Sequence, residues 1–136
     1  PPGHRLAAKR AISPEDLRGE PFISLALEDP TRRRVDRVFE DAGVDRNIVV
    51  ETQYAMTICG LVLEGVGCSI LNPITSADFA MRGLVVRPFE PLIEFQSVLY
   101  TPVHRPLSIA ALRFLQTMRD VRDTMAKEGV FGEPLR

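Results

Sequence analysis

Two short apolar runs in this sequence each lead into an acidic or amide residue that is followed directly by proline. Residues 22–27 run into Asp29-Pro30, and residues 68–71 run into Asn72-Pro73. Asp and Asn are preferred helix N-caps, and proline is favoured at the first helical position. Each junction therefore predicts a strand followed at once by a helix, whose free N–H groups and positive dipole attract polar or anionic molecules.

Both capping residues should face the same rim of a sheet, because ligands of open α/β sheets bind where the strands end. The sequence thus predicts a pocket for a small polar or anionic molecule there. The alternative is purely structural, since an N-cap stabilises a helix by about 1 kcal/mol and this alone explains Asp29 and Asn72. The sequence leaves both interpretations open.

Alternating strands and helices are predicted along the chain, which indicates an α/β fold with a largely parallel sheet. The first ten residues are expected to be extended. The expected strands are residues 22–27, 47–51, 68–71, 84–86 and 95–101, and the expected helices are residues 13–17, 30–42, 52–64, 73–81 and 107–127.

Apolar periodicity predicts which faces of two helices are buried. In helix 30–42 the outer face is expected to carry the pair Arg32/Asp36, and the basic run 31–34 either lies in solvent or neutralises an anionic partner. The final helix is predicted to turn five residues inward: Ile109, Leu112, Phe114, Leu115 and Met118.

Composition narrows the class of protein. The 136 residues are 45% hydrophobic, enough for one domain with a core, and the net charge of −1 argues against a nucleic-acid-binding domain. No apolar run approaches a membrane span, and the first residues are not a signal peptide. Cys59 and Cys68 lack metal-site spacing and are predicted to be buried reduced thiols, so a cytoplasmic protein is expected. Neither a metal motif nor a nucleophile motif occurs, so we expect no metal, no cofactor and no catalytic residue.

Several segments, taken in order, resemble the effector-binding domain of LysR-type transcriptional regulators. They are residues 17–23, 39–43, 63–71, 82–86 and 104–108, followed by the final helix. The resemblance implies a periplasmic-binding-protein-like (type 2) α/β fold with an effector cleft between two lobes and a mixed, largely parallel sheet. It implies that residues 1–12 connect from the first lobe, that residues 13–93 form the second lobe, and that residues 94–136 return to the first. The rest of the first lobe and a winged helix-turn-helix would lie outside this chain.

The resemblance also implies a set of ligand-binding residues at the predicted rim. Residues 22–32 and 71–75 look most like members that respond to diaminopimelate or opines, so the expected effector is amino-acid-like. Asp29 could pair with an ammonium group, while the Thr31 N–H and Asn72 could hold a carboxylate. The full set is Asp29, Pro30, Thr31, Tyr54, Asn72, Pro73 and Thr75.

The favoured function is therefore effector sensing without catalysis. The expected partners are a small molecule, further copies of the chain in a dimer or tetramer, and DNA only through the N-terminal domain outside this chain. No membrane partner is expected. Helix 30–42 and strand 47–51 are the candidates for the dimer surface. Two other classes remain as alternatives, a solute-binding protein of a transporter and a fragment of an α/β enzyme.

Overall fold

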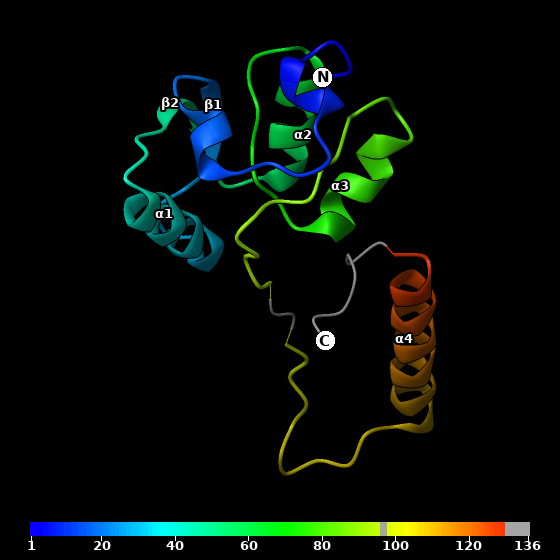
Figure 1. Ribbon diagram of the computed structural model, residues 1–136. Coiled ribbons are helices and arrows are strands. Elements are labelled where there is room, and N and C mark those ends of the chain that lie inside the picture. Colours follow the sequence, from blue (N-terminus) through cyan, green and yellow to red (C-terminus); the bar gives the residue numbers. More distant parts are fainter. Residues whose placement is uncertain (96–97, 130–136) are drawn as a thin grey trace. The chain divides into compact units, whose positions relative to one another are not determined.

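Two parallel strands organise the first part of the chain in the computed structural model, which describes residues 1–95 and 98–129. β1 (Pro21–Leu25) pairs with β2 (Asn47–Thr52), and the two lie side by side in Figure 1. Leu25 lies opposite Thr52, so both strands end at the same edge. The chain divides into two units, residues 1–95 and residues 96–136.

Helices connect and follow the strands, as the sequence predicts. The first unit contains α1 (Pro30–Ala42), α2 (Ala55–Leu63) and α3 (Pro73–Ala80), preceded by 3-10 helices at Arg5–Ala8 and Pro14–Leu17. The second contains α4 (Ile109–Lys127). The turn at Arg5–Ala8 replaces the extended chain expected there, and the short helix predicted at residues 13–17 is of the tighter 3-10 type. Within the described residues, no helix has the length and apolar character needed to cross a membrane.

The limits of α1 follow from its end residues. Asp29 caps the first turn, Pro30 occupies the first helical position, and Gly43 ends the helix in the left-handed conformation (φ 63°). A glycine adopts that conformation at no steric cost, which is why it ends helices so often. The predicted range of residues 30–42 is confirmed.

Successive side chains of β1 point to opposite layers, as the pleat of a strand requires. Phe22 packs with Val35 and Phe39 of α1, and its ring meets that of Phe39 edge-on at 6.0 Å between centroids. Ile23 packs on the other side, in a cluster that includes Ile58 of α2. The sheet is thus covered by α1 on one face and α2 on the other.

A third segment runs along the free edge of β1, parallel to it. The N–H of Cys68 donates to the Pro21 carbonyl and the N–H of Ile23 donates to the Cys68 carbonyl, both at 2.9 Å. Beyond this bridge the next carbonyl, that of Ile23, accepts from the Ser69 hydroxyl (2.7 Å). Residues 68–71 therefore have the predicted position, but as a single bridge rather than a regular strand.

The strands predicted after α3 are wrong where the structure describes them. Residues 84–86 form no strand in the described part of the chain, because Leu84 folds back onto α3: its N–H donates to the Phe79 carbonyl. Phe89 instead forms an isolated parallel bridge with Ile12. Of the strand expected at residues 95–101, residues 96–97 lie outside the described residues, and 95 and 98–101 form no strand.

The described residues of the second unit supply no surface that covers the inward face predicted for the final helix. Ile109 and Phe114 are 74% and 64% exposed, and no described residue of α4 is buried. The amphipathic pattern predicts the helix correctly because helix formation depends on local spacing. Burial of one face also requires a second surface to pack against that face, which the helix cannot supply by itself.

Candidate functional site

The first junction, residues 25–32, joins β1 to α1 through a short loop that is bonded on both sides. The N–H of Ala26 donates to the carbonyl of Thr52 on β2, and the N–H of Asp29 donates to the Ala26 carbonyl, both at 3.0 Å. The N–H of Arg32 then donates to the Asp29 carbonyl, also at 3.0 Å. These backbone bonds hold Ala26 and Asp29 at the two ends of the loop.

Asp29 acts as the N-cap that its position predicts. Its Oδ1 accepts from the backbone N–H of Thr31 at 2.7 Å. Asp29 and Thr31 are half-buried and Pro30 is exposed, so the cap stands at the surface. The Thr31 N–H, expected to hold a ligand carboxylate, is already occupied by the Asp29 carboxylate.

The second junction, residues 69–76, is built from neutral groups. Oδ1 of Asn72 accepts from the N–H of Thr75 (2.9 Å) and from its hydroxyl (3.2 Å). The buried Ser76 hydroxyl donates back to the carbonyl of Pro73 (3.1 Å). Asn72, Pro73 and Thr75 are half-buried. The Asn72 carbonyl accepts from the Ser76 N–H at 3.4 Å, so both oxygens of this cap serve the first turn of α3.

Parallel pairing brings the two junctions to one edge. Residues 68–69 and β2 flank β1 in the same direction, so all three segments end at the same side. Tyr54 follows β2 at this edge as the residue before α2; its side chain makes no capping bond and it is 69% exposed. This common direction agrees with the predicted rim, on which the seven candidate residues would lie.

Arg32 is the residue at this rim whose role sequence reasoning missed. The pair with Asp36 was expected and forms (Nε to Oδ1, 2.7 Å), but on the inner side: Arg32 is only 7% exposed. Nη1 of Arg32 donates to the Leu25 carbonyl and to Oε2 of Glu51, both at 2.8 Å. One signal was present, since an arginine in the first turn opposes the helix dipole and needs acceptors elsewhere.

Asp36 links Arg32 to a second buried arginine. Arg46 also donates to Oδ1 of Asp36, and its guanidinium lies 4.9 Å from the Phe39 ring centroid and 5.3 Å from that of Phe22. Burial by itself raises the pKa of Asp36, but the hydrogen bonds from Arg32 and Arg46 outweigh it and hold that pKa below its ordinary value. Asp36 is therefore ionised at neutral pH and holds both cations in place.

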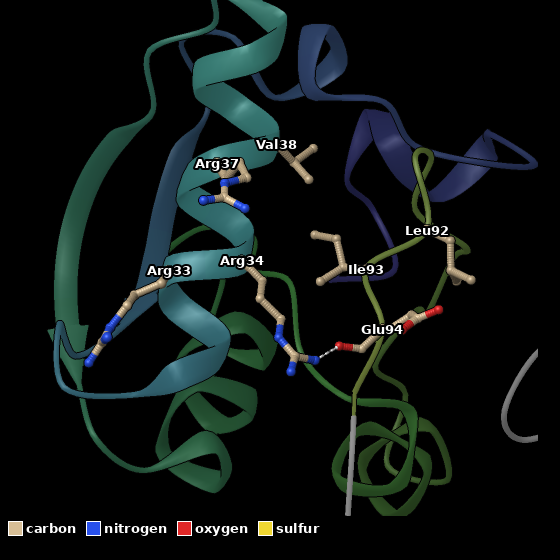
Figure 2. Close-up of a pocket in the computed structure, with 7 residues that line it drawn as sticks. All are labelled: Arg33, Arg34, Arg37, Val38, Leu92, Ile93 and Glu94. Atoms are coloured by element: carbon tan, nitrogen blue, oxygen red, sulfur yellow. Dashed lines mark hydrogen bonds between the residues drawn. The ribbon is translucent and has the colours of Figure 1, made fainter.

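A separate open hollow of about 340 Å³ lies on another side of α1 (Figure 2). Its walls are Val38 and three arginines of α1 on one side and residues 92–94 on the other. In Figure 2, Arg34 reaches across to the Glu94 carbonyl, while Arg33 points away from Ile93. None of the seven predicted residues lines this hollow, so it does not coincide with the rim described above.

The thiols are arranged for packing and not for reaction. Both cysteines are free; Cys59 is buried as predicted, whereas Cys68 is only half-buried. Burial raises the pKa of the Cys68 thiol to about 11, and it raises that of Cys59 as well. Neither thiol is a thiolate at neutral pH. Among the described residues, no group of three or more His, Cys, Asp or Glu side chains could hold a metal.

Comparison with known proteins connects this architecture to one family. Residues 1–123 match the family model of the LysR substrate binding domain. The chain is 43% identical over 114 residues to the transcriptional activator protein LysR of Escherichia coli K12, covering 84% of this chain and 37% of that protein. It is 28% identical over 130 residues to the regulatory protein NocR of Agrobacterium tumefaciens T37, covering 96% and 43%. The chain thus spans about two fifths of the length of these relatives.

A solved structure is similar in fold. The regulatory domain of NMB2055 (MetR), a LysR family regulator from N. meningitidis, matches with a TM-score of 0.54 over 66% of this chain and 42% of that chain, at 22% identity. The resemblance to this family that the sequence shows is therefore confirmed over residues 1–123 of the chain. The chain belongs to the LysR substrate-binding domain family and has the periplasmic-binding-protein-like α/β fold of that family.

Proposed function

We propose that this chain is the effector-sensing part of a LysR-type transcription regulator and that it binds a small amino-acid-like molecule. The observation that carries the proposal is the rim itself: an anionic cap and a neutral cap stand at the ends of parallel segments, with Tyr54 beside them. The names of the relatives, a transcriptional activator and a regulatory protein, support a regulatory role and not an enzymatic one.

The chemistry of the rim favours a ligand that carries an ammonium group. Asp29 uses Oδ1 for its own helix, so Oδ2 is the oxygen left for a cation. The amide nitrogen of Asn72, whose Oδ1 is used by Thr75, is a donor for a carboxylate. Because the Thr31 N–H is occupied, this amide and groups of the first lobe take over the carboxylate contact that was expected of Thr31. Diaminopimelate and opines contain both groups and are the favoured effectors.

The organisation implied by the family completes the proposal. Residues 13–93 form the second lobe, residues 1–12 enter it from the first lobe, and residues 94–136 return to the first. The effector lies between the lobes, and closure around it changes the arrangement of subunits and of a DNA-binding domain outside this chain.

A homo-oligomer is part of the same proposal, with α1 and β2 as its surface. Ile48 and Val49 of β2 are 38% and 46% exposed on a strand that pairs on one side with β1. Exposed apolar residues on an edge strand mark a surface that another chain can cover. Light scattering of the intact protein should show a dimer or tetramer that Val49→Asp shifts toward monomer, and a concentration-independent monomer in the unmodified protein contradicts this part of the proposal.

The substitution Asp29→Asn tests the effector site. Asn caps a helix as well as Asp, so stability should remain the same while the charge is lost. Calorimetry of the intact protein with diaminopimelate should show affinity weakened by about 2 kcal/mol, the value of a hydrogen bond to a charged group. Asp41→Asn, an exposed acid at the other end of α1, is the matched control and should bind normally. Unchanged affinity in Asp29→Asn would leave this residue with its capping role alone.

A further inference from the structure

Arg32 contacts both ends of the loop that presents Asp29. Its side chain binds the Leu25 carbonyl, the last residue of β1, and its backbone N–H binds the Asp29 carbonyl, the last residue before α1. Residues 26–29 therefore form a loop closed by a single residue. The same guanidinium reaches Glu51 on β2 and Asp36 on α1.

These contacts tie the loop to both strands of the sheet and to the helix that covers it. Glu51 lies opposite Ser24 in the register of β1 and β2, and Asp36 is one turn further along α1. Arg32 thus connects two strands and one helix at the point where the chain turns toward the rim. At 7% exposure it lies beneath this surface and not on it.

We propose that Arg32 is a positioning residue for the effector site, which fixes the loop at residues 26–29 and thereby the place of the Asp29 carboxylate. This inference rests on the proposed function, because it assigns Asp29 a ligand. Arg32 itself touches no effector. It acts through the loop, so its removal should loosen the site without removing any group that contacts the ligand.

The geometry requires arginine and not a general cation. The guanidinium uses Nε for Asp36 and Nη1 for Leu25 and Glu51, so acceptors on three elements are held by one rigid plane. A lysine ammonium is a point donor on a flexible stem and cannot meet the same three directions at once. Arg32→Lys therefore keeps the charge and loses the fixed spacing.

The first arm of the test uses the intact protein without ligand. Hydrogen exchange of the Ala26, Asp29 and Thr31 amides should become at least tenfold faster in Arg32→Lys. Val35→Ala is the matched control. It also shortens a buried side chain of α1 and lowers global stability, but Val35 is apolar and forms no charged hydrogen bond to the loop. After correction for global stability, these three amides should remain protected in Val35→Ala. Equal exchange in the two variants would overturn the proposal.

The second arm measures binding of diaminopimelate by calorimetry. Arg32→Lys should raise the dissociation constant about tenfold, the effect of one lost hydrogen bond to a charged group, whereas Val35→Ala should not change it. If Arg32→Lys folds poorly, Glu51→Gln removes one of its charged partners with a milder effect and should shift exchange and affinity in the same direction. A wild-type protein that does not bind diaminopimelate contradicts the proposed effector class, and the exchange arm then decides on Arg32 alone.

Discussion

The two strand-to-helix junctions look alike in sequence and are stabilised in different ways. Each has a capping residue, a proline and a threonine in the first helical turn. The first junction is held by buried charge, with Arg32 bonded to Asp36, Glu51 and the Leu25 carbonyl. The second is held by the hydroxyls of Ser69, Thr75 and Ser76.

Because of this difference, the two junctions should tolerate amino-acid substitutions to different degrees. A buried ion pair that loses one partner leaves an uncompensated charge, which costs far more than the loss of a neutral hydrogen bond. The first junction should therefore be fixed in place at neutral pH, and the second should be easier to alter. Under the proposed function, the first junction is the one expected to select a charged effector, because its supporting groups are themselves charged.

The largest effect is expected from Asp36→Asn. Arg32 and Arg46, with side chains 9% and 8% exposed, both depend on this carboxylate. Its loss should lower the free energy of unfolding by about 3 kcal/mol at neutral pH. Urea melts of the intact protein measure this, and Asp41→Asn should change the result by less than about 0.5 kcal/mol.

The pH dependence sharpens the same prediction. Because the pKa of Asp36 is lowered in the folded state, its stabilisation is complete above the ordinary Asp value of about 3.9 and is lost as the pH falls through the lowered value. The difference between wild type and Asp36→Asn should therefore be constant from pH 7 to 5 and shrink below about pH 4. A constant difference down to pH 2 would contradict a charge-based first junction.

Gly67→Ala should cause the next largest loss of stability, because it pushes the segment that leads to the second junction away from β1. A Cβ at residue 67 would overlap the Pro21 carbonyl oxygen, in the place where residues 67–69 approach β1. We expect a loss of about 2 kcal/mol, typical of overpacking. Gly60→Ala is the matched control, because a Cβ there meets nothing within 4 Å and alanine favours the helix. Melts that show equal stability for the two variants would contradict the close approach.

The contrast between the junctions also shows what could be predicted from sequence. Capping residues and apolar periodicity act locally, so they predicted α1, α3 and the position of Asp29 and Asn72 correctly. The helix expected from residue 52 begins only at Ala55, because residues 51–52 still pair in β2. Tertiary contacts decided the rest. Arg32 is buried because β1 and β2 end beneath it, and Leu84 bonds to α3 instead of entering the sheet. In α4 the apolar pattern predicts the helix and its apolar face, but it does not predict which surface covers that face.

Asn72→Ala should cost about 1 kcal/mol, the ordinary value of an N-cap, because the second junction has no charge to expose. Asn72→Asp restores the acceptor for the Thr75 N–H and should recover the stability. It should also weaken binding of a ligand carboxylate, since the amide donor is replaced by a negative charge. Denaturant melts and calorimetry on the two variants separate the capping role from the binding role, and wild-type affinity in both variants would remove Asn72 from the site.

The smallest effect on stability is expected from Glu51→Gln at the first junction. Glu51 is 41% exposed at its side chain, so water screens its pair with Arg32, and the amide oxygen of Gln can still accept from Nη1. The free energy of unfolding should fall by less than about 1 kcal/mol. The two pairs share the same buried Arg32 but differ in the exposure of the carboxylate. Comparing Glu51→Gln with Asp36→Asn therefore shows which hydrogen bond of Arg32 stabilises the junction more, the one from Nη1 to Glu51 or the one from Nε to Asp36. If the two variants lose equal stability in urea melts, exposure of the carboxylate does not govern these pairs, and the ranking of all four substitutions has to be revised.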